Sequence, residues 1–217
     1  MITVIIAEDH KIVRSGLCHF FNTVPDIQVV AETGLGREAV RLAAEMRPDV
    51  LILDMDLPDI NGMDVMGRLA DSGVAVNILF LTMYDNADLA GHLMKAGAKG
   101  FIIKTGEPEE LVEALRKIKS GGIYITPAIR DDLLTSQFSG ASDTDSLESL
   151  SQREMQVLLK LAQGDTITDI ADKLCLSQGT VKTYKHRILT KLGIKKKRGP
   201  HPLLHETRPH LRITPLK

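Results

Sequence analysis

Residues 50–54 read Val-Leu-Ile-Leu-Asp, a run of four apolar residues that ends on a carboxylate. Three other short apolar runs end on a reactive side chain: one leads into Glu8-Asp9, one into Thr82 and one into Lys104. In an open parallel sheet the carboxyl ends of all strands lie at one edge, where ligands bind. The pattern therefore predicts one crevice that contains carboxylates, a hydroxyl and an amine.

The sequence around these runs alternates strand-like segments with helical periods up to about residue 120. Helices are predicted near residues 11–22, 36–46, 62–70, 86–95 and 107–119. Five strand–helix repeats with helices of this length favour a parallel sheet that is covered on both faces. The first part of the chain is therefore predicted to be an α/β domain, with its crevice at the edge described above.

The predicted crevice has the hard oxygen donors that Mg²⁺ prefers. Asp9 and Asp54 would bind the ion directly, Glu8 directly or through water, and Asp56 through its backbone carbonyl. A carboxylate nucleophile needs its charge offset before a phosphate can approach, and the metal and Lys104 would supply that offset. Any one of these residues alone is more simply explained as a helix cap or loop residue. Their coincidence at the strand ends favours Mg²⁺-assisted phosphoryl chemistry.

Other polar residues near the crevice are expected to be structural. The segment 59–62, Asp-Ile-Asn-Gly, is a turn signal, and the side chains of Asp56, Asp59 and Asn61 are assigned to local structure. His10 and His19 have no paired ligand at a useful spacing and are expected on the surface or on a helix.

After residue 120 the composition changes twice. Residues 121–147 are predicted to be a linker rich in Asp, Ser and Thr, with a short helix near 128–134. The helical period returns at Ser151, where Ser151 and Glu154 form the pattern of a capping box. Two short helices follow one another, and a longer basic helix begins after Ser177. This arrangement is typical of a helix-turn-helix unit.

The net charge of −1 is the sum of an acidic first part of the chain and a basic last part. Residues 1–120 contain 12 Lys and Arg against 18 Asp and Glu, residues 151–194 contain 7 against 4, and residues 195–217 contain 7 against 1. This division predicts a metal or small-ligand site in the acidic N-terminal part and a polyanionic partner for the basic C-terminal part. No apolar run approaches the roughly 20 residues of a membrane span, so a cytoplasmic protein without membrane contact is expected.

The motifs of the first part resemble the receiver domain of bacterial two-component response regulators. The resemblance covers residues 1–120 and rests on Glu8-Asp9, Asp54 followed by Leu57-Pro58 and Gly62, Thr82, and Phe101 three residues before Lys104. It implies a flavodoxin-like five-stranded parallel sheet of order 2-1-3-4-5. Asp54 would accept phosphate from a phosphohistidine on a sensor histidine kinase, with Mg²⁺ held at the residues named above. Thr82 and Phe101 would form the switch pair, and the positions of Asp56 and Tyr84 tune the phosphate lifetime in the family.

Residues 148–194 resemble the helix-turn-helix of the LuxR/NarL/FixJ class, through segments 150–154, 177–185 and 188–194. The resemblance places three apolar residues of the last helix inward, namely Val181, Ile188 and Leu192. It implies that the outward face binds DNA, through Thr180, Lys182, Thr183, Lys185, His186, Arg187 and Lys191. Lys182, Thr183 and His186 would face bases. The other cations, Lys185, Arg187 and Lys191, are better placed for phosphates, which position a protein without specifying sequence.

Residues 195–217 depart from the family, which continues here into a fourth amphipathic helix that builds the dimer on DNA. Four prolines leave no window longer than six residues in this segment, too short for a marginal helix in water. We expect an atypical basic tail that is disordered, and rank a basic arm along DNA phosphates second. A shifted reading frame is a hypothesis for its origin that the encoding DNA would test. Because the fourth helix is missing, we expect a homodimer that forms on phosphorylation to be weakened.

The leading interpretation is a response regulator that accepts phosphate on Asp54 and regulates transcription, and that is not an enzyme beyond its own phosphorylation and dephosphorylation. One alternative is a receiver that acts through protein contacts alone, because the altered tail disables DNA binding. Another is a phosphoaspartyl hydrolase, since Asp54 and Asp56 resemble the Asp-x-Asp motif of haloacid dehalogenase-type enzymes. Those enzymes carry their acidic pair late in the chain, whereas Glu8-Asp9 comes first here.

Overall fold

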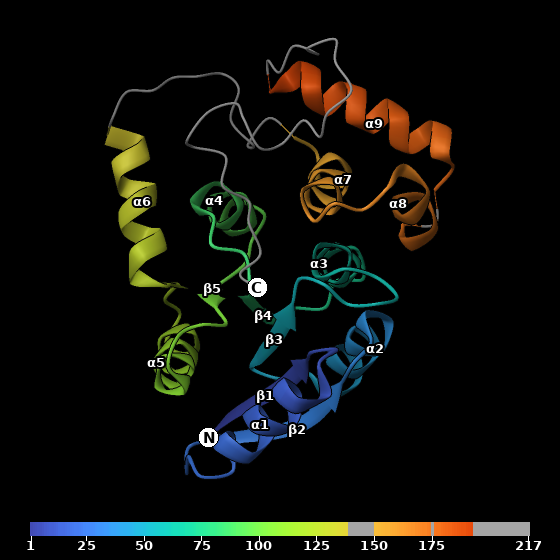
Figure 1. Cartoon of the computed structure of the whole chain (residues 1–217). Coiled ribbons are helices and arrows are strands. Elements are labelled where there is room, and N and C mark those ends of the chain that lie inside the picture. Colours follow the sequence, from blue (N-terminus) through green and yellow to red (C-terminus); the bar gives the residue numbers. More distant parts are fainter. Residues whose placement is uncertain (139–149, 175, 193–217) are drawn as a thin grey trace. The chain divides into compact units, whose positions relative to one another are not determined.

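The computed structural model describes residues 1–138, 150–174 and 176–192 of the 217-residue chain (Figure 1). Its contacts divide the chain into two compact units. The first comprises Met1–Met83 and Leu93–Arg130, and the second comprises Tyr84–His92 and Asp131–Lys217. None of the helices in the described ranges is long and apolar enough to cross a membrane.

A parallel sheet forms the centre of the first unit. Its strands are β1 (Ile2–Ala7), β2 (Ile27–Thr33), β3 (Val50–Asp54), β4 (Asn77–Thr82), β5 (Gly100–Ile103) and β6 (Tyr124–Ile125). The strand order is β2-β1-β3-β4-β5-β6, which confirms the predicted order of the first five strands. The sheet is nevertheless one strand wider than predicted, because Tyr124 and Ile125 pair with Gly100 and Phe101 of β5.

Six helices follow these strands along the chain, namely α1 (Lys11–Phe21), α2 (Gly36–Met46), α3 (Gly62–Asp71), α4 (Ala87–Lys95), α5 (Pro108–Lys119) and α6 (Pro127–Phe138). Most of α4 and α6 belongs to the second unit, which contains residues 84–92 and the chain from residue 131. The first five helices lie close to the predicted ranges. The segment predicted as a linker begins with β6 and α6; α6 confirms the short helix predicted near 128–134 and extends it to residue 138. Residues 139–147 of that segment lie outside the described part of the chain.

Helices cover both faces of the sheet because its strands are apolar on both sides. Successive side chains of a strand point to opposite faces. Val4 and Ile6 of β1 belong to a core cluster that also contains Phe21 of α1 and Leu111 of α5. On the opposite face α3 approaches so closely that a Cβ on Gly62 would lie 2.9 Å from the ring of Phe80. The strands are thus buried on both faces, as expected for a parallel sheet.

Three further helices lie in the second unit, namely α7 (Gln152–Ala162), α8 (Ile167–Lys173) and α9 (Gln178–Lys191). The predicted capping box opens α7: Ser151 Oγ accepts from the Glu154 backbone N–H, and Glu154 Oε2 accepts from the Ser151 N–H at 2.8 Å. The three helices pack on one another. Val181, Ile188 and Leu192 are buried, as predicted for the inward face of α9.

Candidate functional site

The ends of four neighbouring strands bring the predicted crevice residues to one edge of the sheet. Asp54 is the last residue of β3, Thr82 is the last of β4, and Glu8 and Lys104 follow β1 and β5. Asp54 is 4% exposed, Glu8 1% and Thr82 0%. The strand order β1-β3-β4-β5 places these ends side by side. The buried polar residues therefore converge from segments that are far apart in the sequence.

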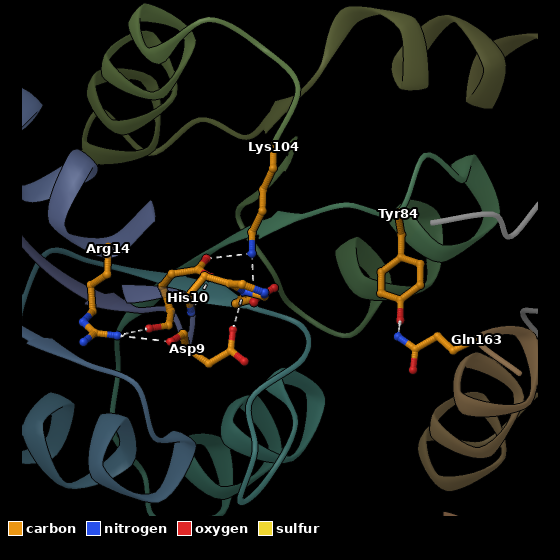
Figure 2. Close-up of polar contacts among 8 residues, drawn as sticks. Asp9, His10, Arg14, Tyr84, Lys104 and Gln163 are labelled. Atoms are coloured by element: carbon orange, nitrogen blue, oxygen red, sulfur yellow. Dashed lines mark hydrogen bonds and ion pairs between the residues drawn. The ribbon is translucent and has the colours of Figure 1, made fainter. Parts of the chain in front are cut away.

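Lys104 joins two of the carboxylates. Its Nζ lies 2.7 Å from Glu8 Oε2 and 2.8 Å from Asp54 Oδ2 (Figure 2). Burial raises the pKa of Asp54 to about 6; the Lys104 ammonium opposes this rise, whereas Glu8 and Asp56 add to it. Burial lowers the pKa of Lys104, but its contacts with Asp54 and Glu8 outweigh that effect and the pKa lies above its usual value. Lys104 thus stays charged beside Asp54.

Arg14 holds the loop between β1 and α1 in place. Its Nη1 donates to the backbone carbonyl of Glu8 at 2.6 Å and lies 3.5 Å from that of Asp9 (Figure 2). Side chains on a helix point back toward its N-terminus, which directs Arg14 from the first turn of α1 onto this loop. Sequence reasoning missed Arg14. No spacing in the sequence indicates this contact, because it depends on the path of the loop between β1 and α1.

His10 is exposed, as expected, but it is not isolated from the carboxylates. Its Nδ1 lies 2.7 Å from Asp9 Oδ1 and 3.1 Å from Glu8 Oε1, and its side chain is 70% exposed. Its backbone N–H also donates to Glu8 Oε1 at 3.1 Å. The expectation that His10 lacks ligand partners was wrong, because the turn after β1 folds its ring back over the acidic pair.

The cluster has the composition of a divalent-cation site. Among the described residues, Glu8, Asp9, His10 and Asp54 each offer a ligand atom, and these atoms lie within 4.8 Å of one another. Glu8 Oε2 is fully buried, and the geometry of its ion pair with Lys104 is not that of an aligned hydrogen bond. Three carboxylates against one ammonium leave two negative charges in excess. Hard oxygens and this excess charge fit a divalent ion.

The loops that follow β3 are set by local structure, as predicted. Asn61 Oδ1 caps α3 by accepting from the Asp64 N–H at 3.0 Å. Asp59 accepts from the backbone N–H groups of Gly36 and Arg37 at the start of α2. A Cβ on Gly62 would lie 2.6 Å from the Asp54 carbonyl oxygen, so the chain can pass beneath Asp54 only because residue 62 is a glycine.

The family resemblance assigns roles to two further residues, Phe101 and Tyr84, and both side chains are buried. Phe101 of β5 is 0% exposed, and Tyr84, which follows β4, is 2% exposed. The Tyr84 hydroxyl accepts a hydrogen bond from the side-chain amide of Gln163, and both residues belong to the second unit (Figure 2). Thr82 and Phe101 belong to adjacent strands of the first unit.

The outward face of α9 carries most of the residues predicted to contact DNA. Lys182, Thr183, His186 and Arg187 are exposed, and Thr180 and Lys185 are partly exposed. Val181 and Ile188 are buried on the opposite side. The exposed positions recur with helical spacing, so α9 presents one continuous polar and basic stripe.

Lys191 has a different environment from the other cations of α9. Its Nζ lies 2.6 Å from Oε2 of Glu154, which is 3% exposed and opens α7. Burial raises the pKa of Glu154, but hydrogen bonds from Lys191 and Ser151 outweigh that effect and the pKa lies below its usual value. Lys191 therefore joins α9 to α7 through an ion pair.

Comparison with known proteins identifies both parts of the chain. Residues 4–116 match the family "Response regulator receiver domain", and residues 148–199 match "Bacterial regulatory proteins, luxR family". The chain is 35% identical over 194 residues to the response regulator GacA of Pseudomonas aeruginosa, covering 89% of this chain and 91% of that protein. It is 37% identical over 202 residues to the oxygen regulatory protein NreC of Staphylococcus epidermidis, covering 89% and 92%.

The fold is similar to that of a solved structure of RcsB from Salmonella enterica serovar Typhimurium, bound to promoter P1flhDC in the presence of the phosphomimetic BeF3-. The two share 26% sequence identity with a TM-score of 0.71, over 90% of this chain and 94% of that one. Regulators of this kind are transcription factors of two-component systems rather than classical enzymes, and their partners are a histidine kinase and DNA. The chain belongs to the LuxR/NarL/FixJ family of two-component response regulators, with a receiver domain followed by a LuxR-type helix-turn-helix domain.

Proposed function

We propose that Asp54 is the phosphoacceptor of this response regulator, and that phosphate on Asp54 controls DNA binding through α9. The observation that carries the proposal is the buried Asp54 carboxylate at a strand end, with the Lys104 ammonium 2.8 Å away. The ammonium offsets carboxylate charge where a phosphate dianion has to approach. An isolated buried carboxylate without such a partner would repel its substrate.

In the proposed step an Asp54 carboxylate oxygen attacks the phosphorus of a phosphohistidine on the kinase. The new O–P bond forms as the P–N bond breaks, and the departing imidazole takes up a proton from solvent. Lys104 stabilises the charge on the transferring group. Asp9, Asp54 and the Asp56 carbonyl, with Glu8 directly or through water, would hold Mg²⁺, and the ion would supply further positive charge at the site of transfer. Loss of the phosphate by hydrolysis returns Asp54 to its free form.

The proposed switch uses the two buried residues next to this site. Thr82 donates a hydrogen bond to a phosphoryl oxygen on Asp54, and Phe101 turns into the space that Thr82 leaves. Both are 0% exposed, so their movement requires repacking and favours two discrete arrangements. Phosphorylation then shifts the balance between arrangements that already exist. Asp56 and Tyr84 would set how long the phosphate persists.

For DNA binding we propose that the exposed stripe of α9 enters the major groove. Lys182, Thr183 and His186, with Thr180 at the start of the helix, would face the bases. Lys185 and Arg187 would contact phosphates. We leave Lys191 out of this surface, because its ion pair with Glu154 gives it a structural role. That RcsB was solved on a promoter supports this use of the fold. A homodimer on DNA is part of the proposal.

The test is labelling with a small phosphodonor such as acetyl phosphate in the presence of Mg²⁺, followed by mass spectrometry and size-exclusion chromatography. We expect one phosphoryl group on the intact chain and none on Asp54→Asn. Asp71→Asn, an exposed carboxylate at the end of α3, is the matched control and should be labelled like the wild type. Labelling of Asp54→Asn would overturn the assignment. A shift of only the labelled chain to a larger size would support the dimer.

A further inference from the structure

The imidazole of His10 lies among the carboxylates that are proposed to hold the metal. Its Nδ1 approaches Asp9 Oδ1 at 2.7 Å and Glu8 Oε1 at 3.1 Å. It is one of the four groups whose ligand atoms lie within 4.8 Å of one another. The family resemblance implies a ligand set made of oxygen atoms alone. The structure thus adds a nitrogen donor to that set.

The contact of His10 with Asp9 brings a nitrogen donor and a carboxylate oxygen together at the acidic cluster. At 2.7 Å from Asp9 Oδ1, the Nδ1 atom lies near enough for one cation to be bound by both side chains. Glu8 contacts both of its neighbours in the cluster: Oε1 lies 3.1 Å from His10 Nδ1, and the buried Oε2 lies 2.7 Å from Lys104 Nζ. The carboxylate face of the cluster that His10 approaches is therefore that of Glu8 Oε1 and Asp9 Oδ1.

The donor set decides which cations gain from His10. Mg²⁺ prefers oxygen ligands and sheds its water reluctantly, so an imidazole adds little to its binding. Imidazole suits divalent transition metals, whose affinity for nitrogen sites rises from Mn²⁺ toward Cu²⁺. The carboxylates of Asp9 and Asp54 serve either class. His10 is therefore the one member of the cluster that separates a transition metal from Mg²⁺ by its chemistry.

We propose that His10 is a metal-selecting ligand, and that the acidic site binds divalent transition metals through His10 Nδ1 together with the carboxylates of Asp9 and Asp54. This inference rests on the proposed metal site of the receiver domain and deepens it by naming the class of ion. Its consequence is regulatory: the ion bound at Asp54 reflects which divalent metals are available, while Mg²⁺ still supports the site through oxygen ligands alone.

The test uses the full chain, with Mn²⁺ as the probe. Electron spin-echo envelope modulation of bound Mn²⁺ reports directly on a coordinated nitrogen, and calorimetry gives the affinities for Mn²⁺, Co²⁺ and Mg²⁺. We expect a nitrogen signal in the wild type that is absent in His10→Ala. We also expect His10→Ala to weaken Co²⁺ binding roughly tenfold, Mn²⁺ binding by about threefold and Mg²⁺ binding by less than about twofold.

His19→Ala is the matched control, because His19 is an exposed histidine on α1 outside the metal-ligand cluster, and it should behave like the wild type. If His10 only orients Asp9 by a hydrogen bond, Mn²⁺ and Mg²⁺ affinities fall together and no nitrogen signal is seen, which overturns the proposal. Unchanged Mn²⁺ affinity in His10→Ala also overturns it. Labelling of Asp54 with Mg²⁺ is measured in the same variants, so that failure of His10 as a ligand is distinguished from failure of Asp54 as phosphoacceptor.

Discussion

Asp54 lowers the stability of the receiver unit at neutral pH. Burial raises its pKa from 3.8 to about 6, even though Lys104 lies beside it. A carboxyl group with a raised pKa binds more protons in the folded state than in the unfolded state between these two values. The free energy of unfolding therefore falls as the pH rises from about 4 to about 6, and the cost remains at neutral pH. The proposed role of Asp54 as phosphoacceptor requires this carboxylate, which gives a reason for the cost.

Replacing Asp54 by Asn should therefore stabilise the protein at neutral pH. In EDTA at pH 7 we expect Asp54→Asn to raise the free energy of unfolding of the first unit by about 1–3 kcal/mol, because a neutral side chain of similar shape is cheaper to bury. Near pH 4 the gain should disappear, since Asp54 is then protonated in the folded state. Urea unfolding at several pH values measures both. Asp71→Asn should show no such trend, and an equal gain for Asp54→Asn at both pH values would contradict the explanation.

At the residue scale, the sequence alone was sufficient to predict which side chains at the ends of the strands lie close together. Asp54, Thr82 and Lys104 could be identified because each ends an apolar run, and parallel topology then places them together. His10 and Arg14 could not be identified in the same way. Their contacts depend on how the loop after β1 turns and on the direction of a helical side chain, and neither leaves a pattern in residue spacing.

At the scale of elements, periodicity predicted the long helices and missed the small additions. β6 has two residues, too few to show an alternating pattern, and only Ile123 separates it from Gly121 and Gly122, which indicate a turn. Its existence is decided by pairing with β5, a contact that sequence spacing does not reveal. The capping box at Ser151 was predicted in full because its hydrogen bonds form within four residues.

Thr126, directly after β6, ties three elements of the receiver unit together. Its hydroxyl donates to Glu110 Oε1 of α5 at 2.8 Å, and the hydroxyl oxygen lies 3.4 Å from the Ile103 N–H. Its backbone N–H donates to the Phe101 carbonyl at 3.0 Å. β6 is therefore anchored to the strand that precedes Lys104 and contains Phe101.

Thr126→Val keeps the shape of the side chain and removes its hydroxyl. We expect the first unit to lose about 1–2 kcal/mol in its free energy of unfolding, because Glu110 and the end of β5 lose a partly buried partner. Thermal or urea unfolding monitored by circular dichroism measures the change. Thr105→Val, at an exposed position after Lys104, is the control and should change stability by less than about 0.5 kcal/mol. A loss of the same size in both variants would assign the effect to the substitution type rather than to the hydrogen bonds.

At the scale of the whole molecule, acidic residues are in excess in the first part of the chain and basic residues in the last part. The acidic first 120 residues contain the metal-type cluster, and the basic residues of α9 lie on an exposed face. The basic segment 195–217, which we expected to be a disordered tail, lies outside the described residues. Because the basic residues of α9 and the residues around Asp54 belong to different units, the proposed DNA contacts can be removed by single substitutions that leave the phosphoacceptor in place.

This division leads to a prediction for the intact chain on a DNA duplex that is selected with a phosphorylated chain carrying a restored fourth helix. Acetyl phosphate should raise the DNA affinity of the wild type by about tenfold, within the usual range of coupling between two sites, and should leave Asp54→Asn unchanged. Arg187→Ala should be labelled normally but bind DNA more weakly in both states, and the slope of log affinity against log salt should become shallower by about 0.9 for the lost phosphate contact. Fluorescence anisotropy at several salt concentrations measures all three. If the wild type does not bind DNA in either state, while a chain with a restored fourth helix does, the protein acts through protein contacts and the proposed output is wrong.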